Sequence, residues 1–255
     1  MNFLTIQSRR IHYVRLQSKK TKGHSPTIVM LHEGLGSIAM WQKFPQQVSD
    51  ATGCDVLVYS RHNYGNSDPI GRDYDDDFLH KEALEILPEI LDRLHIKKPI
   101  LLGHSDGGSI TLIHAGGTEC DLTGVILMAP HVLVENISFS GLVAIKEAYM
   151  NTDLRKRLGQ YHAHVDAAFY GWNNVWLRPD LRGWNIEEYL PLISCPVLAI
   201  QGADDEYGTM EQIDIIGRKV KDVELLKLSR CGHSPHKDQP IVVLKAITDF
   251  LAKRF

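Results

Sequence analysis

Short apolar runs alternate with longer helical patterns along most of the chain, and this alternation restricts the fold more than any other feature. The predicted strands are residues 3–7, 10–16, 27–31, 55–59, 100–103, 125–129, 197–201 and 224–228. The predicted helices are residues 40–51, 76–94, 107–115 and 241–255. Strands joined by helices form right-handed crossovers in a mostly parallel sheet. The sequence therefore predicts an α/β fold whose sheet is covered by helices on both faces.

Residues 131–193 interrupt this alternation of strands and helices, because they contain no clear strand and only short helical patterns broken by glycine and proline. The stretch is too long for a simple crossover. It is also rich in aromatic residues, including three of the four tryptophans. These aromatics either pack into a small core of their own or line an apolar pocket over the sheet, and the two uses are compatible. We predict a core domain of residues 1–130 and 194–255 and a helical cap insertion at residues 131–193.

Composition excludes several classes of function. The formal net charge of −3 gives the surface no electrostatic reason to bind phosphate backbones, so we expect no nucleic-acid partner. Mean hydropathy is −0.17 and no apolar run approaches the ~20 residues of a membrane span, so we expect no membrane partner. The N-terminal residues lack the pattern of a signal peptide. The four cysteines are scattered without a Cys-x-x-Cys pair, which is typical of reduced thiols in the cytoplasm.

The segment most informative about chemistry is Gly103-His-Ser105-Asp-Gly107, which lies between a predicted strand and a predicted helix. A nucleophile elbow needs this arrangement, because its turn is so tight that side chains at the two glycine positions would collide. The pattern Gly-x-Ser-x-Gly alone is weak evidence, and its place between strand and helix strengthens it. Asp106 begins the helix, so its backbone N–H is free to point at an anion.

A second glycine-containing turn, residues 32–37, follows the predicted strand at 27–31. Glycine at position 34 lets a main-chain N–H approach a substrate oxygen closely, as an oxyanion hole requires. Alone, the segment is only a turn before a helix. Together with the elbow, it is the expected second oxyanion donor.

A serine nucleophile needs a base that a carboxylate orients, and the last third of the chain offers both. Asp204 and Asp205 follow the predicted strand at 197–201, and His233 follows the strand at 224–228. Carboxyl ends of parallel strands are where sites of open α/β sheets form. The order Ser, Asp, His along the chain is the one found in α/β hydrolases.

These motifs make the chain similar to the α/β-hydrolase-fold serine hydrolases, and the similarity covers essentially the whole sequence. It extends from the His-x-Gly-x-Gly turn, through residues 61–68, to the final Gly-His; residues 61–68 resemble the family's Gly-Tyr-Gly-x-Ser loop. The resemblance implies Ser105 as nucleophile, His233 as general base and no metal or organic cofactor. It implies an acid three residues after Gly202, which is Asp205, with Asp204 as the alternative. It also implies an oxyanion hole made by the N–H groups of Gly34 and Asp106.

Two residues depart from the family pattern. Glu33 stands where many members have glycine, and Asp106 follows the nucleophile where Met, Gln or Trp is common. They either recognise a polar or cationic group of the substrate or form local contacts at a turn and a helix start. We name Glu33, Trp41 and His131 as candidate substrate-binding residues. For Trp41 core packing is the favoured interpretation, and for His131 a structural role is weighed equally.

The combined prediction is a carboxylic ester hydrolase that works through an acyl-enzyme on a small-molecule substrate with a carbonyl group. Small or medium esters, lactones and thioesters are the expected substrates. One alternative keeps the triad and hydrolyses C–C bonds of β-diketones or ring-cleavage products. A second alternative is a ligand receptor with little turnover. Spacing at His162, His164 and Asp166 favours packing or a surface position over a metal site, because alternate residues of a helix face different directions.

Overall fold

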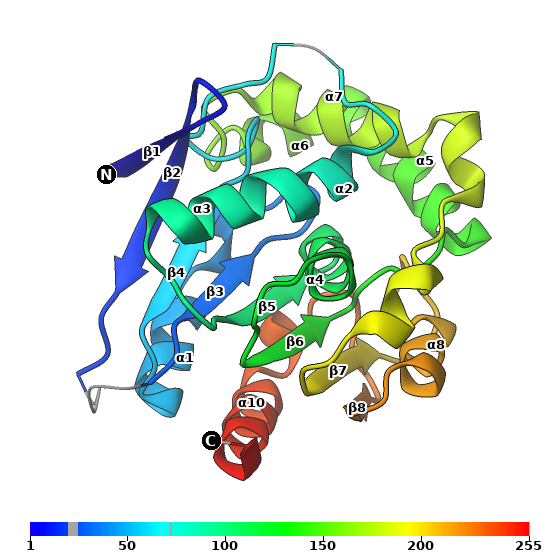
Figure 1. The fold of residues 1–255 in the computed structure, drawn as a ribbon. Helices are drawn as coiled ribbons and strands as arrows, with labels where there is room; N and C mark the ends of the chain where they lie inside the picture. The colour runs from blue at the N-terminus through cyan, green and yellow to red at the C-terminus, as the bar shows by residue number, and fades with distance from the viewer. Residues whose placement is uncertain (20–24, 72, 255) are drawn as a thin grey trace.

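The computed structural model describes residues 1–19, 25–71 and 73–254. Its centre is an eight-stranded sheet with the order β1-β2-β4-β3-β5-β6-β7-β8 (Figure 1). The strands are β1 (Asn2–Ile6), β2 (Arg9–Leu16), β3 (Ile28–Leu31), β4 (Val56–Tyr59), β5 (Ile100–His104), β6 (Gly124–Met128), β7 (Val197–Gly202) and β8 (Val223–Leu228). β2 is antiparallel to both β1 and β4, and all other neighbours are parallel. The predicted α/β fold with a mostly parallel sheet is confirmed.

Register places the ends of neighbouring strands at the same level. Leu31 of β3 lies opposite Gly103 of β5, and Gly202 of β7 lies opposite Leu228 of β8. The loops that follow these four strands therefore leave the sheet along one edge. All the candidate catalytic and oxyanion residues belong to these loops or to the turn and helix that begin there.

Helices cover both faces of the sheet, because successive side chains of each buried strand point to opposite sides. On one face Ile28 and Met30 pack in a cluster with residues of α1 (Phe44–Thr52) and α10 (Pro240–Arg254). On the other face Val29 and Leu31 pack in a second cluster with residues of α2 (Phe78–Lys81), α3 (Leu87–Arg93), α4 (Asp106–Gly117) and α8 (Glu211–Lys219). Each face thus has its own hydrophobic core.

The long helical pattern predicted at residues 76–94 is helical without a gap from Phe78 to Arg93, but its geometry changes just before Pro88. Between α2 and α3 lies a π-helical turn, η2 (Glu82–Ile86), and Pro88 occupies the first turn of α3. In a regular α-helix the proline ring would clash with the carbonyl of Leu84, and a wider π turn relieves that clash.

The helix predicted at residues 40–51 begins later than expected. Ile38–Trp41 form a separate 3₁₀ turn, η1, and Gln42 has a φ of +52° before α1 begins at Phe44. The left-handed residue changes the chain direction, so a single helix over the whole pattern was wrong. Helix α8 was not predicted, although its buried Ile213, Ile215 and Ile216 line one side of it.

Residues 131–193 form helices between β6 and β7, and we call them the insertion. They comprise α5 (Asn136–Asn151), α6 (Leu154–Leu158), α7 (Val165–Trp176), η3 (Pro179–Gly183) and η4 (Glu187–Leu192). Figure 1 shows α5, α6 and α7 at the end of the molecule opposite α10. One hydrophobic cluster continues from the sheet into the insertion, so the division into a core domain and a cap stays a prediction. In the part of the chain that the structure describes, no helix combines the length and apolar character needed to span a bilayer.

Candidate active site

Ser105 lies at the tight turn between β5 and α4, with φ of +53° and ψ of −120°. Glycine is required on both sides of it. A Cβ atom on Gly103 would lie 2.2 Å from the carbonyl oxygen of Gly107, and a Cβ on Gly107 would lie 2.1 Å from that of Leu31. The strained φ of Ser105 is the conformation that directs its hydroxyl away from the sheet edge, as in a nucleophile elbow.

Three side chains from separate strand ends form a continuous chain of hydrogen-bond contacts. The Nε2 atom of His233 is 2.9 Å from the Oγ of Ser105. Its Nδ1 atom is 2.8 Å and 2.9 Å from the two carboxylate oxygens of Asp205. With Asp205 ionised, Nδ1 carries the proton and donates it, which leaves Nε2 free to accept the serine proton. This is the geometry of a nucleophile, a base and an orienting acid.

The carboxylate of Asp205 is buried and well supplied with donors, whereas Asp204 is exposed. Oδ1 accepts the backbone N–H groups of Tyr207 and Gly208 at 2.8 Å and 3.2 Å, and Oδ2 accepts the Gln201 amide at 2.7 Å. Burial raises the pKa of Asp205, but His233, the backbone N–H of Tyr207 and the nearby His131 outweigh burial and lower it. Of the two aspartates left open by the sequence, Asp205 is the one that contacts His233.

Gly34 and Asp106, the two candidate oxyanion residues, both border the same cavity as Ser105. Asp106 is the first residue of α4, so its N–H has no carbonyl partner four residues earlier in the helix. Gly34 is pressed against the Trp172 indole of α7: a Cβ at position 34 would lie 2.0 Å from the indole nitrogen. Glycine is therefore the residue that fits this close approach.

Glu33 lies on the wall of the cavity and faces basic groups. Its Oε2 is 3.4 Å from Nδ1 of His104, and its Oε1 is 3.8 Å from Nζ of Lys237. Burial raises the pKa of Glu33, yet the neighbouring His104, Lys237 and His236 bring it well below its ordinary value. Nε2 of His104 in turn contacts the backbone carbonyl of His233 at 2.7 Å. Through His104, Glu33 is thus connected to the turn of Ser105 and to the loop of His233.

Asp106 is paired with Arg61, a residue that sequence reasoning did not single out. Asp106 and Arg61 are both buried, and Nη2 of Arg61 lies 3.5 Å from Oδ2 of Asp106. Burial raises the pKa of Asp106, and Arg61 opposes the rise. One feature of the sequence could have drawn attention to Arg61: it lies two residues after a buried strand, in the segment that resembles the family's loop. Nothing in the sequence indicated, however, which carboxylate would pair with it.

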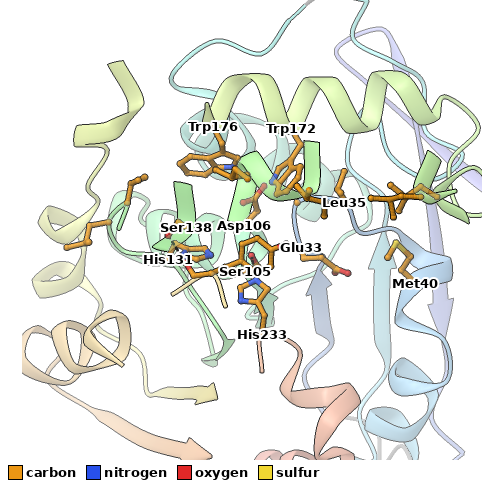
Figure 2. A pocket seen from close by; sticks show the side chains of 18 residues that line it. Glu33, Leu35, Met40, Ser105, Asp106, His131, Ser138, Trp172, Trp176 and His233 are labelled. Atoms are coloured by element: carbon orange, nitrogen blue, oxygen red, sulfur yellow. Dashed lines mark hydrogen bonds between the residues drawn. The ribbon is translucent and has the colours of Figure 1, made fainter. Parts of the chain in front are cut away.

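The candidate site opens into a cavity of about 240 Å³, which Figure 2 shows from close by. The insertion supplies most of its apolar wall: Leu133, Val134, Leu142, Ile145, Leu154, Leu158, Trp172 and Trp176. In Figure 2, Trp172 and Trp176 reach down from their helix toward Ser105 and His233. Other aromatics of the insertion pack on one another, as Tyr149 does on Phe169 with ring centroids 3.6 Å apart. The aromatic residues of the insertion thus have both expected uses: some line the cavity and others pack on one another.

Two of the candidate substrate-binding residues border the cavity and one does not. Glu33 and His131 lie on its wall. The ring centroid of His131 is 5.5 Å from that of His233, and burial lowers the pKa of His131 to about 4, helped by the neighbouring His233. Trp41 instead packs on Phe44 in the core cluster shared with α1 and α10, and its neighbour Met40 reaches the cavity. The assignment of Trp41 to substrate binding is therefore corrected: its ring faces the core.

His162 holds the insertion to the loops of the site. Its Nδ1 accepts the Gly65 N–H at 3.0 Å, so its Nε2 carries the proton and donates to the Leu35 carbonyl, also at 3.0 Å. Asp166 pairs instead with Arg155 and with the hydroxyl of Tyr149. Among residues 1–19, 25–71 and 73–254, no group of three or more His, Cys, Asp or Glu side chains could hold a metal ion.

Known proteins resemble this chain along most of its length. Human serine hydrolase BPHL is 26% identical over 211 residues, which cover 77% of this chain and 69% of that protein. A 2-hydroxy-6-oxononadienedioate/2-hydroxy-6-oxononatrienedioate hydrolase of Cupriavidus pinatubonensis is 24% identical over 281 residues, covering 98% of this chain and 94% of the relative. A crystal structure from work on carboxylesterases of the thaumarchaeon Nitrososphaera gargenis superposes with a TM-score of 0.80 at 18% identity, covering 99% and 98% of the two chains.

The model of a protein family described as "Alpha/beta hydrolase family" matches residues 28–246. This range contains β3 to β8, the elbow, the insertion, and the loops of Asp205 and His233. Because the match spans most of the chain, the protein belongs to the alpha/beta hydrolase family.

Proposed function

We propose that this protein is a serine hydrolase that cleaves carboxylic esters, lactones or thioesters through an acyl-enzyme. The observation that carries the proposal is the contact chain from Ser105 Oγ through both ring nitrogens of His233 to Asp205. A serine at its ordinary pKa is a poor nucleophile, and a neutral imidazole oriented by a carboxylate is the group that activates it.

In the proposed reaction, Oγ of Ser105 attacks the substrate carbonyl carbon while Nε2 of His233 takes the hydroxyl proton. The N–H groups of Gly34 and Asp106 hold the resulting oxyanion. His233 then gives the proton to the leaving oxygen or sulfur, and the bond from the carbonyl carbon to that atom breaks. A water molecule, deprotonated by His233, attacks the acyl-enzyme and releases the acid. Asp205 stabilises the imidazolium formed in each half of the cycle.

The cavity supports a small or medium apolar substrate. Its volume of about 240 Å³ lies just below the roughly 300–1,000 Å³ of typical ligand sites. Its wall consists mainly of Leu, Ile, Val and Trp side chains, and among the described residues no Lys or Arg lines it. Glu33 and Asp106 add acidic groups. This lining favours an uncharged acyl or alcohol group over the dicarboxylate substrates that the name of the Cupriavidus relative gives.

The proposal is tested with a series of p-nitrophenyl esters of increasing acyl length, a β-diketone and a fluorophosphonate probe. We expect the wild-type protein to hydrolyse the esters and to be labelled at Ser105, and Ser105→Ala to lose both properties while keeping its circular dichroism spectrum. The matched control is Ser109→Ala, one turn further along α4, which should still be labelled.

Two results would overturn this function. Cleavage of the β-diketone without ester hydrolysis would indicate a C–C bond hydrolase. A folded wild-type protein that is neither labelled nor active on any ester, but binds a small ligand, would indicate a receptor on the same fold.

A further inference from the structure

The side chain of Arg61 joins the two residues proposed as oxyanion donors. It is completely buried after β4, and its guanidinium stacks over Tyr64 at 4.8 Å from the ring centroid. Within the described residues its side-chain hydrogen bonds go to two places only, both through Nη2. One is the backbone carbonyl of Glu33 at 3.1 Å, and the other is the carboxylate of Asp106 at 3.5 Å.

The carbonyl of Glu33 and the N–H of Gly34 belong to one trans peptide unit. In a trans peptide the N–H points opposite to the C=O, so donors that fix this carbonyl also fix the direction of the Gly34 N–H. They also polarise the peptide, since hydrogen bonds in a chain strengthen one another.

His32 supplies a second donor to the same carbonyl. The backbone N–H of Arg61 donates to Nε2 of His32 at 3.0 Å, so the proton of the neutral ring resides on Nδ1. Nδ1 lies 2.7 Å from the Glu33 carbonyl and donates to it. Burial, and after it the charge of Arg61, lower the pKa of His32 well below its ordinary value, which keeps the ring neutral. The backbone N–H of Gly36 is a third donor, at 3.0 Å.

The second contact of Arg61, with the carboxylate of Asp106, affects the charge near the proposed oxyanion hole. An ionised carboxylate on the residue that provides an oxyanion N–H would repel the negative charge that develops on the substrate oxygen. The guanidinium is permanently charged and lies against that carboxylate, so it offsets the repulsion. The same side chain therefore acts on both halves of the proposed oxyanion hole.

We propose that Arg61 is a positioning residue of the oxyanion hole: it orients and polarises the Glu33–Gly34 peptide and neutralises Asp106. This inference depends on the acyl-transfer function proposed above. Arg61 does not touch the reacting atoms, so its effect is on the stability of the tetrahedral state. Substrate binding before that state should be nearly independent of it.

The test compares Arg61→Met in the Asp106→Asn background with Asp106→Asn alone, because removing both members of a buried ion pair avoids an unpaired buried carboxylate. The readouts are kcat and KM on p-nitrophenyl butyrate and the Ki of an alkylboronic acid, whose tetrahedral serine adduct mimics the oxyanion. We expect kcat to fall and Ki to rise together by roughly 10- to 100-fold, less than the loss of a whole oxyanion donor, with KM within about twofold.

Arg61→Lys serves as a second variant, because it keeps the positive charge and so protects folding. One ammonium group cannot reproduce the planar fork of the guanidinium. We expect kcat and boronate affinity to fall together by about fivefold to tenfold relative to wild type. The control is Arg10→Met, which removes an exposed arginine paired with Asp68 and should leave both quantities unchanged.

Equal kcat and equal Ki in each Arg61 variant and its parent, in folded protein, would overturn the role of Arg61. So would a rise in KM with kcat unchanged. If wild type neither hydrolyses the ester nor binds the boronate, the proposed function itself fails. If wild type does both and the variants match their parents, only the inference about Arg61 fails.

Discussion

The two sides of the cavity are built from different chemistry. One side consists of the loops at the strand ends, where Ser105, His233, Asp205, Arg61 and Glu33 are held by hydrogen bonds and ion pairs. The other side is the insertion, whose contribution to the cavity is mainly aliphatic and aromatic. Figure 2 shows the two sides facing each other across Ser105.

This difference has a physical reason. Groups that transfer protons or bear charge need fixed geometry, and loops anchored to adjacent strands of one sheet provide it. An apolar wall needs only shape and area, because the hydrophobic effect is not directional. We therefore expect substitutions on the polar side to alter chemistry or stability strongly, and substitutions on the apolar side to alter mainly which substrates fit.

The largest effect is expected at the acid. Asp205→Asn should reduce kcat by about 10³- to 10⁴-fold, because an uncharged amide cannot stabilise the imidazolium and can donate its own N–H to Nδ1 of His233, which leaves the imidazole proton on Nε2. Asp204→Asn, its exposed neighbour, should change kcat by less than about twofold. Steady-state kinetics on a p-nitrophenyl ester measures both. Equal losses in the two variants would remove Asp205 from the proposed triad.

Replacing glycine by alanine should cost much more free energy of unfolding at the turn of Ser105 than in the insertion. Gly107→Ala places a Cβ 2.1 Å from the Leu31 carbonyl oxygen and should lower the free energy of unfolding by about 3 kcal/mol or more. Gly183→Ala in the insertion places its Cβ with nothing within 4 Å and should change it by less than about 0.5 kcal/mol. Urea denaturation gives both values. A similar cost at both positions would contradict the tight packing of the elbow.

The buried carboxyl of Glu82, which interacts with Arg61, should make the stability of the protein depend on pH. Burial raises the pKa of this carboxyl from 4.5 to about 7, with Arg61 partly opposing the rise. Between these two pH values the folded state keeps a proton that the unfolded state loses, so the free energy of unfolding falls as pH rises through this window. The fall is up to roughly 3 kcal/mol.

Glu82→Gln removes this ionisation, so the variant should lose less stability than wild type between pH 5 and pH 8. Urea titrations at several pH values measure the difference. Glu85→Gln, on the exposed side of the same π turn, is the control and should keep the wild-type pH dependence. Parallel curves for wild type and Glu82→Gln would show that Glu82 does not titrate in this range.

The smallest effect is expected on the apolar side. Ile145→Ala removes cavity wall and should lower kcat/KM for a medium-chain ester by about tenfold, which corresponds to the lost burial of roughly two methylene groups at ~0.8 kcal/mol each, with acetyl ester hydrolysis nearly unchanged. Val143→Ala, two residues earlier on α5 and 42% exposed, should alter neither rate. Loss of acetyl ester hydrolysis in Ile145→Ala would show that the insertion does more than shape the pocket.

Much of the fold and part of the site could be predicted from the sequence, because local backbone requirements leave local signals. Buried parallel strands are short apolar runs, and a tight elbow needs Gly103 and Gly107 around its serine. Pro88 is a signal of the same kind, because its ring disfavours a regular α-helical turn before it and a π turn lies there. The start of α1 could not be predicted, since a left-handed Gln42 leaves no comparable signal.

Tertiary structure decided which side chains meet across long separations in the chain. Asp204 and Asp205 are adjacent in sequence, and only the course of the loop after β7 turns Asp205 toward His233. Arg61 and Asp106 are 45 residues apart, so no local pattern pairs them. Trp41 and Met40 are also adjacent in sequence, and only the course of the chain through η1 places Trp41 in the core and Met40 at the cavity. Local sequence specifies the backbone that each segment adopts, whereas contacts between segments exist only after the sheet brings its strand ends together.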